Sequence, residues 1–129
     1  MDKELFAAAM AARQNAYAPY SKFAVGAAVR TMDGTIFTGC NIENASYGLS
    51  ICAERNAIFA AVSKGYNDLT TLCVVADTEK PVSPCGACRQ VMVEFNIQEV
   101  WLTNCAGENK KMTMTELLPA SFSPECLTK

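Results

Sequence analysis

The sequence predicts an α/β fold, a three-layer α/β/α arrangement in which a mixed sheet lies between helices. Segments with helical periodicity alternate with short apolar, β-branched segments, which is typical of α/β proteins. A tight-turn signal at Met32-Asp33-Gly34 joins the first two strand segments as a hairpin. Hairpin strands are antiparallel, whereas strands joined through a helix run parallel, so the sheet is expected to be mixed.

The expected elements follow one another with short connections. The first helix covers residues 2–16, with Asp2 as its candidate N-cap, and ends before Pro19 because a residue preceding proline avoids the helical conformation. Further helices are expected at 53–64, 85–95 and 114–118. Strands are expected at 23–31, 35–40, 69–76 and 99–103. A chain of 129 residues is long enough for one core, so we expect a single domain covering residues 1–129.

Composition excludes several classes of function. The formal net charge is −2, and no cluster of basic residues appears beyond Lys110-Lys111. Proteins that bind nucleic acid normally carry a basic surface, so we expect no nucleic-acid partner, although a free base or nucleoside is compatible. No segment approaches the roughly 20 apolar residues of a membrane helix. The seven cysteines, an odd number without a secretory signal, indicate reduced thiols and a cytoplasmic protein without membrane contact.

The chain contains no histidine, which removes every Ser–His and Cys–His mechanism. Acid–base chemistry must then come from Glu, Asp, Lys, Tyr or water held by a metal. Cys52 and Glu54 form a Cys-x-Glu motif, and Cys85 and Cys88 form a Cys-x-x-Cys motif that begins 33 residues after Cys52. Three thiolates fill three positions of a zinc tetrahedron and leave the fourth for water, as in catalytic zinc sites. The sequence therefore predicts one Zn²⁺ per chain, with Glu54 beside it to move protons.

Both cysteine motifs lie where a strand segment is followed by a helix. Helix N-termini carry free N–H groups and partial positive charge, which lower the pKa of a thiol below its free value of about 8.5. Three thiolates around Zn²⁺ leave an excess of negative charge. We expect Arg55, adjacent to the motif, to offset it by donating hydrogen bonds to ligand sulfurs.

Other interpretations of these residues stay open at this point. A Cys-x-x-Cys motif alone is also found in redox dithiols and in structural zinc sites. A structural site would need a fourth ligand, which would have to be Cys40, Cys73 or Cys105. Taken alone, Glu54 and Arg55 could be solvated helix residues. Three aromatic residues, Phe23, Tyr47 and Phe122, could likewise be core residues.

Four segments together resemble the cytidine deaminases, specifically the small homotetrameric form with three cysteine ligands. They are YAPYSKFAVGAA, GCNIENASYGLSICAER, SPCGACRQV and ELLPASF, and the resemblance covers nearly the whole chain. The zinc deaminases carry an H-x-E…P-C-x-x-C signature in which cysteine can replace the histidine. The resemblance implies a five-stranded mixed sheet, a homotetramer, and hydrolytic deamination of cytidine and deoxycytidine to uridine and deoxyuridine with release of ammonia, in pyrimidine salvage.

The resemblance also implies roles for individual residues. Zinc would be held by Cys52, Cys85 and Cys88, with Glu54 as the proton shuttle and Arg55 facing the ligands. Asn41 and Glu43 would bind the ribose hydroxyls, and Phe23 would pack on the pyrimidine. Phe122 and the segment around Tyr47 would reach into a neighbouring subunit's site. Because a carboxylate such as Glu43 suits sugar hydroxyls better than phosphate, free nucleosides are expected as substrates. A deaminase of the same fold acting on another aminated base or a nucleoside antibiotic is the rival, and the ribose-binding segment argues against it.

Overall fold

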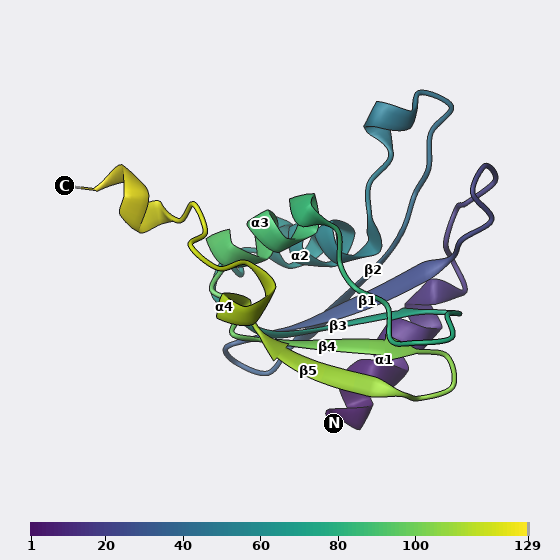
Figure 1. The fold of residues 1–129 in the computed structure, drawn as a ribbon, viewed down its shortest axis with the longest axis horizontal. Helices are drawn as coiled ribbons and strands as arrows, with labels where there is room; N and C mark the ends of the chain where they lie inside the picture. The colour runs from purple at the N-terminus through teal and green to yellow at the C-terminus, as the bar shows by residue number, and fades with distance from the viewer. Residues whose placement is uncertain (129) are drawn as a thin grey trace.

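The computed structural model describes residues 1–128 and contains a five-stranded sheet in the order β2-β1-β3-β4-β5 (Figure 1). The strands are β1 (Val25–Thr31), β2 (Ile36–Cys40), β3 (Leu69–Ala76), β4 (Glu99–Asn104) and β5 (Asn109–Thr113). The helices are α1 (Lys3–Arg13), α2 (Ala53–Ser63), α3 (Gly86–Glu94) and α4 (Met114–Leu117). None of the helices described is long and apolar enough to cross a membrane.

The sheet is mixed, as predicted. β1 pairs antiparallel with both β2 and β3, β3 pairs parallel with β4, and β4 pairs antiparallel with β5. It follows that β2, β3 and β4 run in the same direction, so their carboxyl ends lie at one edge of the sheet. Open α/β sheets bind ligands at such an edge.

Helices cover both faces of the sheet, so the predicted three-layer arrangement is confirmed (Figure 1). On one face Leu5 and Ala9 of α1 pack on a small apolar cluster that includes Cys73. On the other face α2 and α3 pack on the larger core, where Ile58 and Met92 are fully buried. The buried face of α2 contains Ala53, Ala57, Ile58 and Ala61, as its periodicity predicts.

Two elements differ from the expectation drawn from periodicity. Helix α1 ends at Arg13 and not at residue 16, because Tyr17 is extended and pairs with the 41–43 segment: its N–H donates to Asn41 O (3.0 Å), and its carbonyl accepts from Glu43 N (2.9 Å). The fifth strand, β5, was missed by periodicity because its sequence is polar and it lies exposed at the sheet edge.

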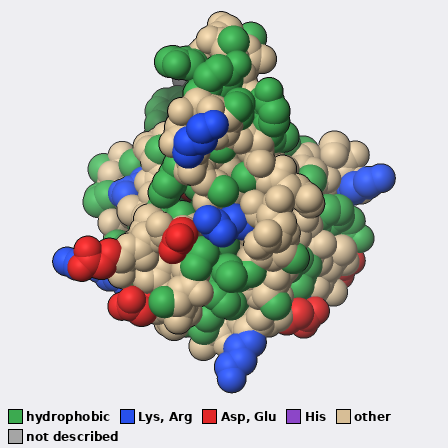
Figure 2. Space-filling view, turned by 90° about the vertical axis from the view of Figure 1, so that its right-hand side faces the viewer, with side chains coloured by type: hydrophobic (Ala, Val, Ile, Leu, Met, Phe, Trp, Pro, Cys, Tyr) green, Lys and Arg blue, Asp and Glu red, His purple; other side chains and the backbone are tan. Residues whose placement is uncertain are grey.

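The connection from β2 to α2 and the C-terminal segment that follows α4 project from the layered body in Figure 1, as does the connection from α1 to β1. The first contains a 3₁₀ turn, Tyr47–Leu49, and the second contains another, Pro124–Leu127. Hydrophobic side chains gather on the projecting upper part of the molecule in Figure 2. In the connection from β2 to α2, Ile42, Tyr47 and Leu49 are exposed. These segments leave large apolar side chains uncovered in a single chain.

Candidate metal centre and substrate pocket

The two cysteine motifs meet at the sheet edge where β2 and β3 end. Cys52 is the N-cap of α2, Cys85 is the N-cap of α3, and Cys88 lies in the first turn of α3. Neither N-cap thiol makes a capping hydrogen bond with its own helix. Two helix N-termini therefore point their partial positive charges at one group of three thiols.

The spacing of the three sulfur atoms fits a zinc ion. Sγ of Cys85 lies 3.8 Å from Sγ of Cys52 and 3.5 Å from Sγ of Cys88. In a tetrahedral site with Zn–S bonds of about 2.3 Å, neighbouring sulfurs are about 3.8 Å apart. Within residues 1–128 no further cysteine joins this group, so the fourth ligand that a closed structural site needs is not supplied by Cys40, Cys73 or Cys105.

Arg55 lies against the thiols, as the charge argument predicts. Its Nη2 is 3.4 Å from Sγ of Cys52. Hydrogen bonds from the Cys88 thiol and from Arg55 lower the pKa of Cys52 to about 5, so this sulfur favours the thiolate form that a metal requires. The Nε of Arg55 is buried and has no hydrogen-bond partner within the described chain. The Nη2 contact places the positive charge of this guanidinium beside the sulfur of Cys52, where it offsets thiolate charge.

Glu54 is buried beside the thiols, with 5% of its surface exposed. Burial raises the pKa of its carboxyl to about 7. The cause is its position in the first turn of α2, on the helix face that packs against the core. A carboxyl with this pKa can take up and release a proton near neutral pH.

A pocket of ≈ 240 Å³ joins the thiols to the predicted substrate contacts. Cys52, Glu54 and Cys85 form one end of its lining, and Phe23, Asn41 and Glu43 form another part. The remaining lining residues are small or apolar: Ser21, Val25, Ala53, Val74, Val82 and Ser83. The structure thus brings together three of the five predicted substrate contacts with the metal centre.

Asn41 and Glu43 are held by hydrogen bonds with residues 20–25, the segment that leads into β1. Asn41 Nδ2 donates to Phe23 O (2.7 Å), and its Oδ1 accepts from Val25 N (2.9 Å). Glu43 accepts from the N–H groups of Tyr20 and Ser21, and from the hydroxyl of Ser21. The Ser21 hydroxyl is the largest cause of a lowered pKa at Glu43, which therefore stays ionised. Sequence reasoning missed Ser21, since nothing in its motif shows that it contacts Glu43.

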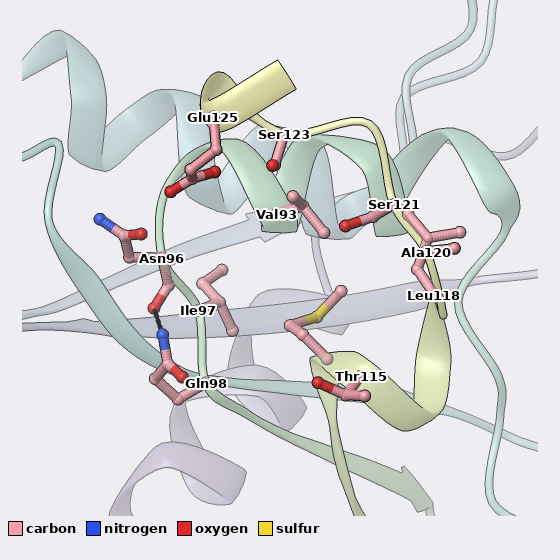
Figure 3. A pocket seen from close by; sticks show the side chains of 11 residues that line it. Val93, Asn96, Ile97, Gln98, Thr115, Leu118, Ala120, Ser121, Ser123 and Glu125 are labelled. Atoms are coloured by element: carbon pink, nitrogen blue, oxygen red, sulfur yellow. Dashed lines mark hydrogen bonds between the residues drawn. The ribbon is translucent and has the colours of Figure 1, made fainter. Parts of the chain in front are cut away.

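The structure does not bring Tyr47 and Phe122 into this pocket. Tyr47 is 75% exposed and lines a neighbouring cavity of ≈ 300 Å³, where its ring packs on Tyr20 at a centroid distance of 5.8 Å. Phe122 is 59% exposed on the C-terminal segment, and its carbonyl accepts from Gln90 Nε2. A further cavity of ≈ 370 Å³ lies between the end of α3, α4 and the C-terminal segment, and it contains none of the predicted site residues (Figure 3).

Comparison with known proteins agrees with this geometry. Residues 1–104 match the family model described as "Cytidine and deoxycytidylate deaminase zinc-binding region". The chain is 55% identical to a cytidine deaminase of Sporosarcina psychrophila (99% of this chain, 96% of that protein) and 52% identical to one of Halalkalibacterium halodurans (97% of each).

Solved structures give the same result. A cytidine deaminase crystal structure from Burkholderia pseudomallei superposes with a TM-score of 0.91 at 51% identity, covering 95% of this chain and 99% of that one. The cytidine deaminase of Mycobacterium tuberculosis gives a TM-score of 0.80 at 40% identity, covering 95% and 98%. These likenesses extend over the fold and the zinc-binding region together.

Proposed function

Because the chain belongs to the cytidine and deoxycytidylate deaminase family, we propose that it hydrolyses cytidine and deoxycytidine to uridine and deoxyuridine with release of ammonia. One observation carries the proposal: a group of three thiols at zinc spacing, two of which line the pocket, lies beside a buried glutamate whose pKa is raised to about 7. A redox dithiol requires neither the third thiol nor the buried carboxyl.

The residues at and beside the pocket have separate roles in the proposed reaction. Cys52, Cys85 and Cys88 would hold Zn²⁺, which, when bound, lowers the pKa of a water molecule and so supplies a nucleophile for C4 of cytosine. Glu54 would take up the proton that this water loses and deliver it to N3 of the ring. It would then take the remaining proton of the attacking hydroxyl group and deliver it to the leaving amino group, which departs as ammonia. Arg55 offsets the charge of the thiolates.

The substrate roles rest on the other part of the lining. Phe23 would pack on the pyrimidine, Asn41 would donate a hydrogen bond to a ribose hydroxyl, and Glu43 would accept one. The Asn41 amide keeps one N–H for this purpose after its bond to Phe23 O. The ribose contact favours a nucleoside over the antibiotic or free-base substrates of the rival deaminases, and a panel of these compounds tests that choice.

Free nucleosides are the preferred substrates in this proposal. The pocket lining contains an ionised Glu43 and no lysine or arginine to neutralise a phosphate. Turnover of cytidine measured beside cytidine monophosphate tests this: we expect a much higher specificity constant for cytidine, and comparable constants would contradict it.

We further propose that the chain is a single catalytic domain that assembles as a cytoplasmic homotetramer and acts in pyrimidine salvage. Support for the assembly comes from the exposure of Tyr47 and Phe122, which lie outside the pocket of their own chain. In the tetramer these side chains would complete a neighbour's site. The mass in solution tests the assembly, and Phe122→Ala is expected to reduce turnover while zinc is retained.

The direct test of the activity follows the absorbance change of cytidine and the ammonia released, with and without a zinc chelator. We expect one ammonia for each uridine formed and loss of activity after chelation. Absence of turnover by the zinc-loaded protein would contradict the proposal.

A further inference from the structure

Within residues 1–128, donors from two consecutive residues hold Glu43 in place. Its Oε1 accepts from Tyr20 N (3.0 Å) and Ser21 N (3.1 Å), and its Oε2 accepts from the Ser21 hydroxyl. An ionised carboxylate offers about four acceptor positions. Three are filled, two on Oε1 and one on Oε2, so one acceptor position remains, and it is on Oε2.

The Ser21 hydroxyl also accepts a hydrogen bond from Phe23 N, at 3.0 Å. A carboxylate can only accept and a backbone N–H can only donate, so both contacts fix the direction of this hydroxyl. Its proton points at Glu43 and its lone pair at Phe23. One hydroxyl therefore connects the predicted ribose ligand to the residue predicted to pack on the pyrimidine.

The turn between these residues needs such a contact. Lys22 has a φ of 62°, in the left-handed region that residues with side chains rarely adopt. The bond from Phe23 N to the Ser21 hydroxyl closes this turn, in the manner of serine turns in general. Asn41 holds the far side of the turn through Phe23 O.

We propose that Ser21 is a positioning residue of the deaminase: its hydroxyl orients Glu43 so that the one free acceptor position on Oε2 meets a single sugar hydroxyl of the substrate. The inference rests on the proposed function and adds to it a residue that touches neither the metal nor the base. Ser21 lines the pocket together with Glu43 and Phe23, which places all three groups at the sugar end of the site.

The test compares a ligand that has the 2′- and 3′-hydroxyls of the ribose with one that lacks both of them. The KM for cytidine and the inhibition constant of 2′,3′-dideoxycytidine are measured in the same cytidine assay for the wild type and for Ser21→Ala. Removing a hydrogen bond to a charged group is expected to raise the KM for cytidine by about tenfold. We expect kcat and the inhibition constant of the dideoxy compound to stay within about twofold, because neither depends on the sugar hydroxyl.

Two further variants keep the test decisive. Ser21→Thr retains the hydroxyl donor, so its KM for cytidine is expected to stay near the wild-type value. Ser21→Cys keeps the shape of the side chain but has only a weak donor, so it should raise the KM as Ser21→Ala does. The cysteine variant therefore replaces Ser21→Ala if the alanine variant does not fold. Ser63→Ala, on an exposed serine at the end of α2, is the matched control. Equal losses for both ligands, or an unchanged KM for cytidine, would overturn the inference. If the wild type does not deaminate cytidine, the proposed function fails instead, before any variant is compared.

Discussion

Glu54 and Glu43 are two carboxyl groups of one pocket in opposite environments. Burial raises the pKa of Glu54 to about 7, whereas hydrogen bonds, chiefly from the Ser21 hydroxyl, lower the pKa of Glu43. Groups whose pKa values are pushed apart in this way usually divide the acid–base roles of a site. Glu54 is therefore suited to carry a proton, and Glu43 is suited to remain an acceptor for hydroxyl groups.

Replacing Glu54 by glutamine tests the proton-carrying role. Glu54→Gln keeps the shape of the side chain but cannot carry a proton, so we expect kcat for cytidine to fall by about 10³-fold. Zinc content should not change, because Glu54 is not a ligand in the proposal. Glu94→Gln, on an exposed residue at the end of α3, is the control. A rate within tenfold of the wild type would remove Glu54 from the mechanism.

Replacing Arg55 by alanine tests whether this residue supports the zinc ligands. Its Nη2 donates to Sγ of Cys52, so Arg55→Ala should keep the fold but lose zinc more readily. Groups that support metal ligands typically contribute 10–100-fold in metal affinity, so roughly that loss is expected here. Competition with a chelator measures it, and Lys64→Ala, an exposed change at the end of α2, is the control. Unchanged zinc affinity and rate would show that Arg55 has no role.

At the scale of elements, the site depends on how helices begin. Cys52 and Cys85 occupy N-cap positions, where Ser, Thr, Asp or Asn usually accept a hydrogen bond from the helix. These thiols make no such bond, so both helices give up a stabilising cap and leave the sulfurs available to a metal. Accurate placement of α2 and α3 on the sheet must then hold the ligands in position.

Gly39 shows how closely α2 approaches the sheet. A Cβ added at Gly39 of β2 would lie 2.3 Å from Ala57 N and 2.7 Å from Ala53 O. Gly39→Ala should therefore push α2 away and destabilise the protein by roughly 1–3 kcal/mol, with loss of zinc affinity. Gly86→Ala meets nothing within 4 Å and is the control. Chemical unfolding and metal content measure both variants, and equal behaviour would contradict the packing argument.

The β1–β2 hairpin supplies a prediction about pH. Hydrogen bonds from the side chains of Thr31 and Thr35 lower the pKa of Asp33 to about 2, below the value near 3.9 of an unfolded chain. A lowered folded-state pKa gives stability that is present above about pH 4 and lost as the pH falls towards 2. The stability difference between wild type and Asp33→Asn should thus be larger at pH 6 than at pH 2.5. A stability difference that stays constant between these two pH values would contradict the prediction.

At the scale of the whole molecule, the sequence predicted correctly those elements whose apolar pattern reflects burial in the core. Residues 69–76 form the central strand β3 with the expected bounds, because both of its faces are covered. Periodicity missed β5, since an exposed edge strand needs no apolar pattern. It also extended α1 too far, because the pairing of Tyr17 with the 41–43 segment is a long-range contact.

Some residues of the site could be predicted from the sequence, and others could not. Motif spacing predicted that Cys52, Glu54, Cys85 and Cys88 lie close together, and the structure places them so. Within each motif the residues lie in the first turn of a helix or just before it, where sequence distance fixes spatial distance. Ser21 could not be found, since its role arises from a left-handed turn that brings it to a residue 22 positions away. Tyr47 and Phe122 stay predictions, because a single chain leaves both exposed.

Zinc reconstitution tests the central claim most directly. Protein stripped of metal by a chelator is titrated with Zn²⁺, and bound zinc and the rate of cytidine deamination are measured on the same samples. The account predicts that the rate rises in proportion to bound zinc and stops rising at one zinc per chain. Full activity in the stripped protein, or zinc bound at one per chain without any deamination, would contradict it.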